Sequence, residues 1–304
     1  MSSIVENEEG VPATAMTQRW MAYFELTKPR ISTMVLITII VATIISSRGQ
    51  TNFATVLNVL VGMFLVAASG NAMNMYLERY SDLLMRRTAK RPLPDQRLTS
   101  VNVLNFAAIT AGAGLAYLLL LTNWQTAVCA LATWLLYSFV YTPLKSLTPL
   151  NTEVGAIAGA MPVACGSLAA TQSMEPFGIG LFTMLLFWQF PHFMAIAWLY
   201  REQYREGGLK MLSVTEPTGR AAGRKAIVMS IATWLASMIP LLAISGPVAK
   251  IVFVLITTVL AAIYFSSSWQ FAKLRDECSA RKLLRISIIY LPLYMIVLLI
   301  FSRM

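Results

Sequence analysis

Nine long apolar stretches dominate the sequence. They lie at about 31–47, 53–76, 101–121, 124–142, 152–171, 177–199, 226–245, 248–268 and 283–301. A helix of about 17 to 25 apolar residues can cross a bilayer. Hydrophobic residues make up 57% of the chain and charged residues only 12%, which a soluble domain of this length does not normally show. We therefore predict an all-α integral membrane protein with about nine transmembrane helices.

The segment before the first apolar stretch carries Glu6, Glu8 and Glu9 and has no apolar core flanked by cations. It is therefore not typical of a cleaved signal peptide. We expect residues 1–27 to be a disordered or interfacial lead-in, and residues 28–304 to form one polytopic membrane domain.

Lysine and arginine gather on one side of the predicted membrane layout. With nine spans, only Arg48, Lys250 and Arg303 of the 24 cations fall on the opposite side. Cytoplasmic loops carry such an excess, so we expect a cytoplasmic N-terminus and an outside C-terminus in a multi-pass protein of the cell membrane. This rim, which anionic lipid also favours, accounts for the net charge of +10, and no nucleic-acid partner is expected.

The cysteines and the single histidine exclude several kinds of site. Cys129 and Cys165 lie in apolar stretches, Cys278 lies in a loop, and no C-x-x-C pair is present, so we expect no disulfide and no thiolate metal site. One histidine, His192, excludes the usual two-histidine metal sites. No G-x-S-x-G or Walker-type sequence supports a hydrolase or an NTPase.

Charge returns abruptly after the second apolar stretch, in "NAMNMYLERYSDLLMRRTAKRPLP" at 71–94. Asn74, Glu78 and Asp82 are spaced by four, so a helix continuing from the second span would carry their oxygens on one face, with Asn71 one turn earlier. Carboxylate and amide oxygens suit a hard cation such as Mg²⁺. The segment therefore predicts a metal site at the membrane surface.

Four cations follow these acids, namely Arg86, Arg87, Lys90 and Arg91. Guanidinium groups bind phosphate in a planar, bidentate way, so acids, metal and arginines together indicate a diphosphate site. The alternative is a solvated juxtamembrane helix whose acids simply pair with its own arginines.

A second acidic segment follows the sixth apolar stretch, in "WLYREQYREGGLKML" at 198–212. Glu202 and Glu206 are again four residues apart, flanked by Arg201, Arg205 and Lys210. Both segments fall on the predicted cytoplasmic face, where two facing acid clusters could hold one diphosphate through two or more metal ions. The chemistry that this arrangement implies is ionisation of an allylic diphosphate.

Asn74, Glu78 and Asp82 match the N-x-x-x-[DE]-x-x-x-D motif of the UbiA-type intramembrane prenyltransferases, which the chain resembles over about residues 20 to 300. The resemblance is strongest to members that farnesylate haem. It rests on "LTKPRI" at 26–31, "RRTAKRPLP" at 86–94, "YTPLK" at 141–145, "WQFPHF" at 188–193 and "YREQYREGGLKMLSV" at 200–214. Two departures are Glu202, Gln203 and Glu206 where Asp is typical, and Lys90 where Asn precedes Arg91, so which oxygens of the second segment bind metal stays open.

The resemblance implies a helical bundle around a central cavity, with Mg²⁺ as cofactor, farnesyl diphosphate as donor and haem B as acceptor. Other membrane proteins of haem biosynthesis or oxidase assembly are its expected partners. The implied catalytic residues are Asn74, Glu78, Asp82, Arg87 and Arg91. The implied metal ligands are Asn74, Glu78, Asp82, Glu202 and Glu206. The expected substrate-binding residues are Asn71, Lys28, Arg30, Arg86, Tyr141, Lys145, His192, Arg201, Tyr204 and Lys210.

His192 follows Pro191, which removes a helical hydrogen bond, so we expect the sixth helix to open locally and Phe190 to leave the α region. His192 would then lie about 15 Å along the helix from Glu202. Ionisable residues inside membrane bundles tend to be functional, and a haem contact is expected. The alternative is a histidine that is hydrogen-bonded only to a neighbour.

Two other functions stay open on the sequence. A secondary transporter also has many apolar helices, but transporters usually show repeated halves and charges at mid-membrane, which this sequence does not. A prenyltransferase that acts on a quinone precursor or another tetrapyrrole would share the acidic motifs and differ only in its acceptor.

Overall fold

The computed structural model describes residues 13–50 and 52–304 of the chain. These residues are almost entirely helical and contain nine helices that are long and apolar enough to cross a membrane. The nine spans are α2 (Pro29–Ser46), α3 (Phe53–Leu77), α5 (Ser100–Leu121), α6 with η1 and α7 (Trp124–Leu147), α8 (Asn151–Thr171), α9 (Pro176–Leu199), α12 with η2 (Arg220–Leu242), α13 (Pro247–Leu274) and α14 (Glu277–Phe301). The predicted nine-helix membrane bundle is confirmed.

The helices extend beyond their apolar stretches where they are flanked by cations. The seventh span begins at Arg220 and not near 226, the eighth ends at Leu274 and not near 268, and the ninth begins at Glu277 and not near 283. An apolar stretch marks only the part of a helix that lies in hydrocarbon. The polar turns stay helical because long Lys and Arg side chains reach the membrane surface.

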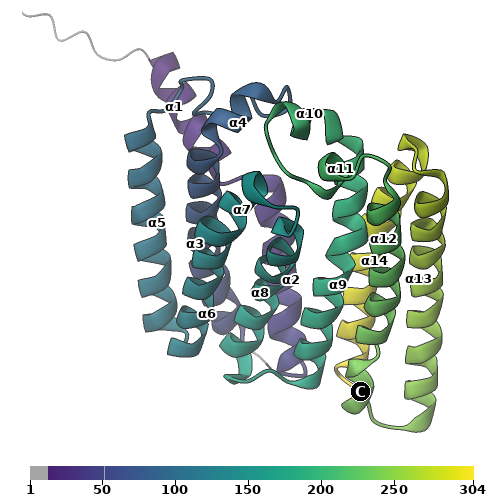
Figure 1. The fold of residues 1–304 in the computed structure, drawn as a ribbon. Coiled ribbons are helices and arrows are strands. Elements are labelled where there is room, and N and C mark those ends of the chain that lie inside the picture. The colour runs from purple at the N-terminus through teal and green to yellow at the C-terminus, as the bar shows by residue number, and fades with distance from the viewer. Residues whose placement is uncertain (1–12, 51) are drawn as a thin grey trace, which may run out of the picture.

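Four short helices gather at one end of the bundle, which we call the site end (Figure 1). They are α1 (Ala13–Leu26), α4 (Arg79–Leu84), α10 (Arg201–Glu206) and α11 (Leu212–Thr215). In α1, Ala22 and Leu26 are buried while Trp20 and Phe24 are exposed. Residues 1–12 of the predicted lead-in lie outside the described residues, and its interfacial placement stays a prediction.

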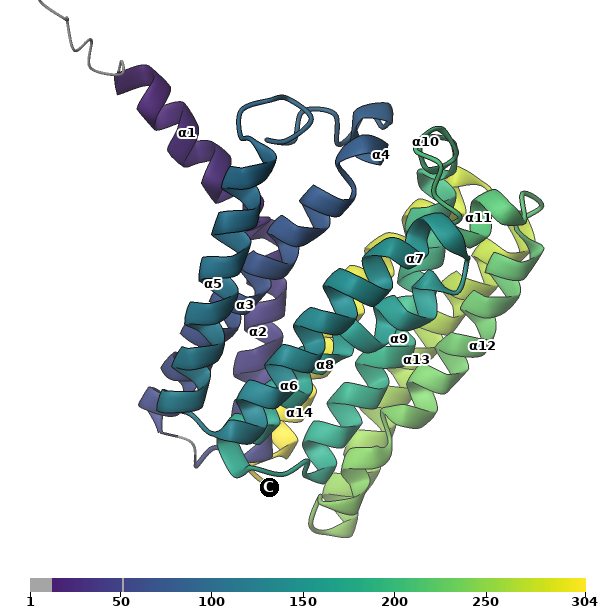
Figure 2. The same ribbon diagram turned by 60° about the vertical axis from the view of Figure 1, so that its left-hand side comes forward.

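The spans form two packed groups that meet at α8 and α9. On one side α3 packs on α5, and α2 packs on α8; on the other, α9 packs on α12 and α14, and α13 lies against α12 and α14. Figures 1 and 2 show α4 and α10 close together above the junction of the two groups. Large apolar residues such as Leu120 and Val248 point outward, as the faces of a protein in lipid require.

The expected opening of the helix at Pro191 is wrong, because α9 runs unbroken from Pro176 to Leu199. Neighbouring side chains supply polar contacts along this part of α9. The Tyr264 hydroxyl donates to the Trp188 carbonyl at 2.8 Å, and Gln189 Nε2 donates to the Leu185 carbonyl at 3.0 Å. They lie on the turns next to the Phe187 carbonyl, which Pro191 deprives of its helical donor, and membrane helices tolerate proline within a packed bundle.

Candidate active site

The first acidic motif spans a one-residue break between α3 and α4. The helix α3 ends at Leu77 and α4 begins at Arg79, so the continuous helix that we expected is interrupted at Glu78. The amide of Glu78 nevertheless donates to the Asn74 carbonyl at 3.0 Å, and the amide of Asp82 donates to the Glu78 carbonyl at 2.8 Å. The helical hydrogen-bond register therefore carries across the break.

The acids of this motif are buried, and the side chains of Asn74, Glu78 and Asp82 are called here the acid cluster. Their exposed fractions are 1%, 8% and 0%. Glu78 Oε1 lies 2.6 Å from Lys145 Nζ, and Arg91 Nη1 lies 2.7 and 2.8 Å from the two carboxylate oxygens of Asp82. A buried charge is stable only when it is paired, which these cations achieve. The acids are therefore not solvated, although Asp82 does pair with an arginine of its own segment.

A third cation, Lys28, reaches the cluster from the turn between α1 and α2. Its Nζ donates to Asn74 Oδ1 at 2.5 Å. The Lys28 backbone is left-handed, with φ 47° and ψ 63°, a conformation that costs a non-glycine residue about 1–3 kcal/mol. Asn71 donates to the Thr27 carbonyl at 2.9 Å and to Ser32 Oγ at 3.2 Å, so it holds this turn in place.

Lys145 is presented by an irregular part of the fourth span. A π-helical segment, η1 (Leu136–Tyr141), separates α6 (Trp124–Leu135) from α7 (Thr142–Leu147), and such segments often occur at functional sites. Lys145 Nζ lies 4.5 Å from the centre of the Tyr141 ring. A Cβ on Gly155 would lie 2.5 Å from that ring, so only glycine lets Tyr141 pack there.

Burial and the neighbouring charges change the pKa values of these side chains. Burial raises the pKa of Glu78, but the charges of Lys145 and Lys28 outweigh burial and hold the pKa below its usual value. Burial also raises the pKa of Asp82, and here Arg91 offsets the effect only in part, so the pKa lies above its usual value. Burial and the charge of Arg91 lower the pKa of Lys28 to about 7.

The second acidic segment meets the first through Gln203 and Tyr204. Gln203 Oε1 accepts from the backbone amide of Arg87 at 3.2 Å. Tyr204 is buried in a small cluster with Met85. A Cβ on Gly207 would lie 2.9 Å from Met85 Cγ, so α10 comes close to the loop that follows α4.

Glu202 and Glu206 themselves are exposed. Glu202 pairs with Arg205 at 2.7 Å and lies 3.8 Å from Arg201, within its own segment. The structure does not bring either acid to the acid cluster, and in the described part of the chain no three carboxylate, histidine or cysteine side chains form a ready metal site. The predicted metal role of Glu202 and Glu206 stays a prediction.

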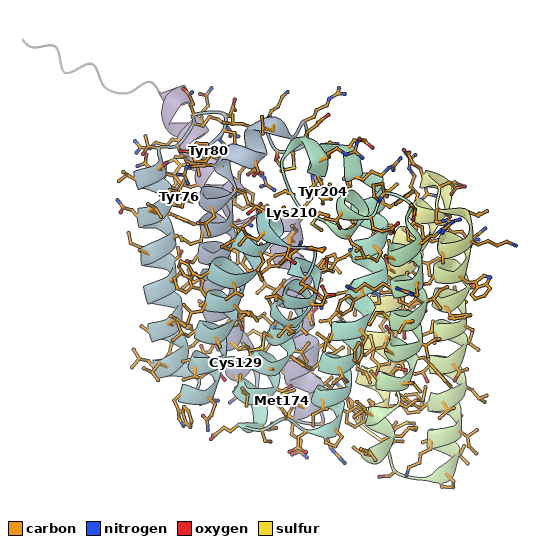
Figure 3. The ribbon with its side chains drawn as sticks, viewed as in Figure 1. Tyr76, Tyr80, Cys129, Met174, Tyr204 and Lys210 are labelled. Carbon is orange, nitrogen blue, oxygen red and sulfur yellow. The ribbon has the colours of Figure 1, made fainter. Side chains whose placement is uncertain are left out.

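The remaining predicted residues lie at different depths of the site end. The Arg87 guanidinium lies 4.8 Å from the Tyr200 ring centre, and Arg201 donates to the Trp198 carbonyl at 2.7 Å. Arg30 and Arg86 are exposed. The backbone amide of Lys210 donates to the Lys145 carbonyl at 2.7 Å, which ties the loop after α10 to α7. Figure 3 shows Tyr204 and Lys210 together at the site end, with Cys129 and Met174 at the opposite end.

His192 lies on α9 and contacts α14. Its Nδ1 is 2.8 Å from Ser287 Oγ, and its ring stacks on Trp188 with 5.0 Å between ring centres. No residue of the acid cluster is among its partners in the described chain.

Sequence reasoning missed three polar partners. Thr142 Oγ1 accepts from Asn74 Nδ2 at 3.2 Å, Gln203 joins the two acidic segments, and Ser287 holds His192. Gln203 stood out in the sequence only as a departure from the family's second acidic motif, and not as a link to the first. Nothing distinguishes Thr142 or Ser287 from other hydroxyl residues in apolar stretches.

The acid cluster can bind a metal ion and a phosphorylated ligand. The side-chain oxygens of Asn74, Glu78 and Asp82, at successive turns, are the donors that Mg²⁺ prefers, so this donor set fits that ion. Lys28, Lys145 and Arg91 surround the same oxygens and would neutralise an anionic ligand.

Comparisons with known proteins place the chain in a family. The model of the UbiA prenyltransferase family matches residues 35–290. The chain is 39% identical to the protoheme IX farnesyltransferase of Rhodopirellula baltica, over 90% of this chain and 97% of that protein. It is 34% identical to the protoheme IX farnesyltransferase of Koribacter versatilis, over 99% of both chains.

Solved structures share the fold at low sequence identity. The chain matches a digeranylgeranylglyceryl phosphate synthase with a TM-score of 0.78 and 18% identity, covering 94% of this chain and 99% of that one. It also matches a UbiA homologue from Archaeoglobus fulgidus bound to GPP and Mg²⁺, with a TM-score of 0.62 and 15% identity, over 91% and 99% of the two chains.

Proposed function

We propose that this chain, which belongs to the UbiA prenyltransferase family, transfers the farnesyl group of farnesyl diphosphate to the 2-vinyl group of protohaem IX (haem B), giving haem O and diphosphate. The observation that carries the proposal is the buried acid cluster with its three cations. The names of its relatives support haem B as the acceptor.

In the proposed reaction the acid cluster binds the diphosphate. Asn74, Glu78 and Asp82 would hold Mg²⁺, which when bound would neutralise charge on the diphosphate oxygens. The structure of a relative bound to GPP and Mg²⁺ supports this cofactor. Glu202 and Glu206 stay proposed ligands of a further metal ion, and they would reach the cluster only after α10 turns toward it.

Three cations stabilise the leaving group. The bond between C1 of the farnesyl group and the diphosphate oxygen breaks, and its electron pair stays on the diphosphate. Lys28, Lys145 and Arg91 converge where that negative charge develops, which is where fixed donors lower a barrier most. Arg87 and Lys210 lie at the same end of the bundle and would add charge around the diphosphate.

The remaining steps need little from the protein beyond exclusion of water. The electron-rich vinyl group attacks the farnesyl cation and forms a carbon–carbon bond, and water then adds to the new cation with loss of a proton. This leaves a hydroxyethylfarnesyl group. The apolar spans limit the access of water to the allylic cation before that step. The scheme requires no strong general base, which suits a chain with one histidine.

We also propose that the site end faces the cytoplasm of the cell membrane, supported by the position of all but three of the 24 cations. Reporter fusions in the loops at 77–100 and 200–225 should both report the cytoplasm. Reporters on opposite sides would exclude one site shared by the two loops.

The reaction can be tested with purified protein, haem B, farnesyl diphosphate and Mg²⁺. We expect a haem product whose mass equals that of haem B plus a farnesyl group and a hydroxyl group, with release of diphosphate. If haem B gives no such product but a quinone precursor or another tetrapyrrole is prenylated, the acceptor is not haem B and the reaction is still prenyl transfer.

A further inference from the structure

The only histidine of the chain contacts Ser287 of α14 and Trp188 of its own helix. His192 Nδ1 lies 2.8 Å from Ser287 Oγ on α14. The ring stacks on Trp188 with an interplanar angle of 21°. Trp188 Nε1 donates to the Ser287 carbonyl at 3.0 Å, and the Trp188 carbonyl accepts from the Tyr264 hydroxyl of α13 at 2.8 Å. The imidazole therefore has a fixed position and a fixed tilt.

The Ser287 hydroxyl has one proton to donate, and where it is donated determines which ring nitrogen of His192 carries a proton. Ser287 Oγ is 2.7 Å from the Leu284 carbonyl oxygen, which can only accept. The single hydroxyl proton of Ser287 is used in that bond, so Oγ meets His192 with a lone pair. The 2.8 Å contact is then a hydrogen bond only if Nδ1 carries the proton and donates.

The other ring nitrogen is consequently a free acceptor. No acidic side chain contacts His192 in the part of the chain that the structure describes, and a lone cation inside a membrane bundle is costly, so the neutral ring is favoured. A neutral ring protonated on Nδ1 keeps its lone pair on Nε2, which makes no hydrogen bond among the described residues. Nε2 therefore has a lone pair that a metal ion could accept.

We propose that Ser287 is a positioning residue, which holds His192 in the tautomer protonated on Nδ1 and so presents the Nε2 lone pair to the iron of the haem acceptor. A ligating histidine commonly has its second nitrogen fixed by such a hydrogen bond, and loss of the partner typically costs about 10- to 100-fold in metal affinity. The identity of the ligand rests on the proposed function, whereas the tautomer does not.

The tautomer can be measured directly because the chain has one histidine. The full chain, purified with a tag that lacks histidine and labelled with ¹⁵N-histidine, gives NMR signals from His192 alone. We expect Nδ1 to show a bonded proton and Nε2 to show the shift of an unprotonated nitrogen, before any haem is added. A proton on Nε2 in the wild-type protein would overturn the proposal.

Variants separate positioning from simple packing. Ser287→Ala should give a mixture of the two tautomers and weaken haem B binding about tenfold on Soret titration, and Ser287→Thr should restore both. Ser230→Ala is the matched control, because Ser230 is also buried and donates to a carbonyl three residues earlier, that of Ile227 at 2.7 Å. It should change neither the tautomer nor the affinity.

The two readouts distinguish failure of this inference from failure of the proposed function. Wild-type protein with the Nδ1 proton that binds no haem B would contradict the acceptor and leave the tautomer standing. Wild-type haem affinity in Ser287→Ala, together with an unchanged tautomer, would show that Ser287 does not position His192.

Discussion

The two acidic segments of this protein have the same pattern and different surroundings. After α3, Glu78 and Asp82 are four residues apart and buried; after α9, Glu202 and Glu206 are four residues apart and exposed. The difference lies in their cations. Glu78 is paired with a lysine 67 residues away in the chain, whereas Glu202, among the residues that the structure describes, pairs only with arginines of its own segment.

Buried Glu78 is paired with Lys145 of a distant segment, and buried Asp82 is paired with Arg91 of its own segment. A carboxylate can stay buried only if a cation is buried with it. The turn before α2 and the helix α7 deliver Lys28 and Lys145 to the acid cluster. No comparable cation reaches α10 from elsewhere in the described chain, so its acids stay in solvent.

The largest expected effect is the loss of turnover when the buried acids are neutralised. The double variant Glu78→Gln with Asp82→Asn should lower kcat at least about 100-fold, because it removes the charges that hold the metal and diphosphate. Haem O formation by purified protein measures this. Asp95→Asn, which alters an exposed acid, is the control and should be near wild type. Near-normal turnover in the double variant would show that the buried acids are not part of the active site.

A second difference should appear in stability. Lys145→Met leaves Glu78 buried without its closest cation and should lower the free energy of unfolding by about 3 kcal/mol. Arg205→Met breaks the exposed pair with Glu202 and should cost less than about 1 kcal/mol. Denaturant unfolding in detergent would compare them. Equal losses for the two variants would contradict the difference in burial.

The smallest effects are expected within α10. Gln203→Ala removes the contact with the Arg87 amide and should raise KM for farnesyl diphosphate about fivefold, because a lost hydrogen bond costs about 1 kcal/mol. Glu202→Gln with Glu206→Gln should slow turnover by less than the buried pair does. A loss of kcat as large as that of Glu78→Gln with Asp82→Asn would show that α10 turns inward during the reaction.

Much of this arrangement could be predicted from the sequence. Nine apolar stretches fixed the number of spans, since only helices of that length cross hydrocarbon, and the spacing of Asn74, Glu78 and Asp82 indicated a shared face. The break at Glu78 and the intact helix at Pro191 could not be predicted, because the spacing of residues records neither where a helix ends nor how a bundle accommodates proline. Which face of α10 packs on the loop after α4 depends on contacts between Met85 and Tyr204. The spacing of residues along the chain does not predict such contacts.

Measuring metal binding in variants of the two acidic segments distinguishes a metal site at the acid cluster from one at α10. Mn²⁺, used in place of Mg²⁺ and followed by electron paramagnetic resonance, reports binding in the presence of farnesyl diphosphate without any turnover. We predict that Glu78→Gln with Asp82→Asn abolishes diphosphate-dependent Mn²⁺ binding, while Glu202→Gln with Glu206→Gln retains at least one bound ion. Mn²⁺ binding that survives in the first variant and is lost in the second would contradict a metal site at the acid cluster and would indicate a site at α10.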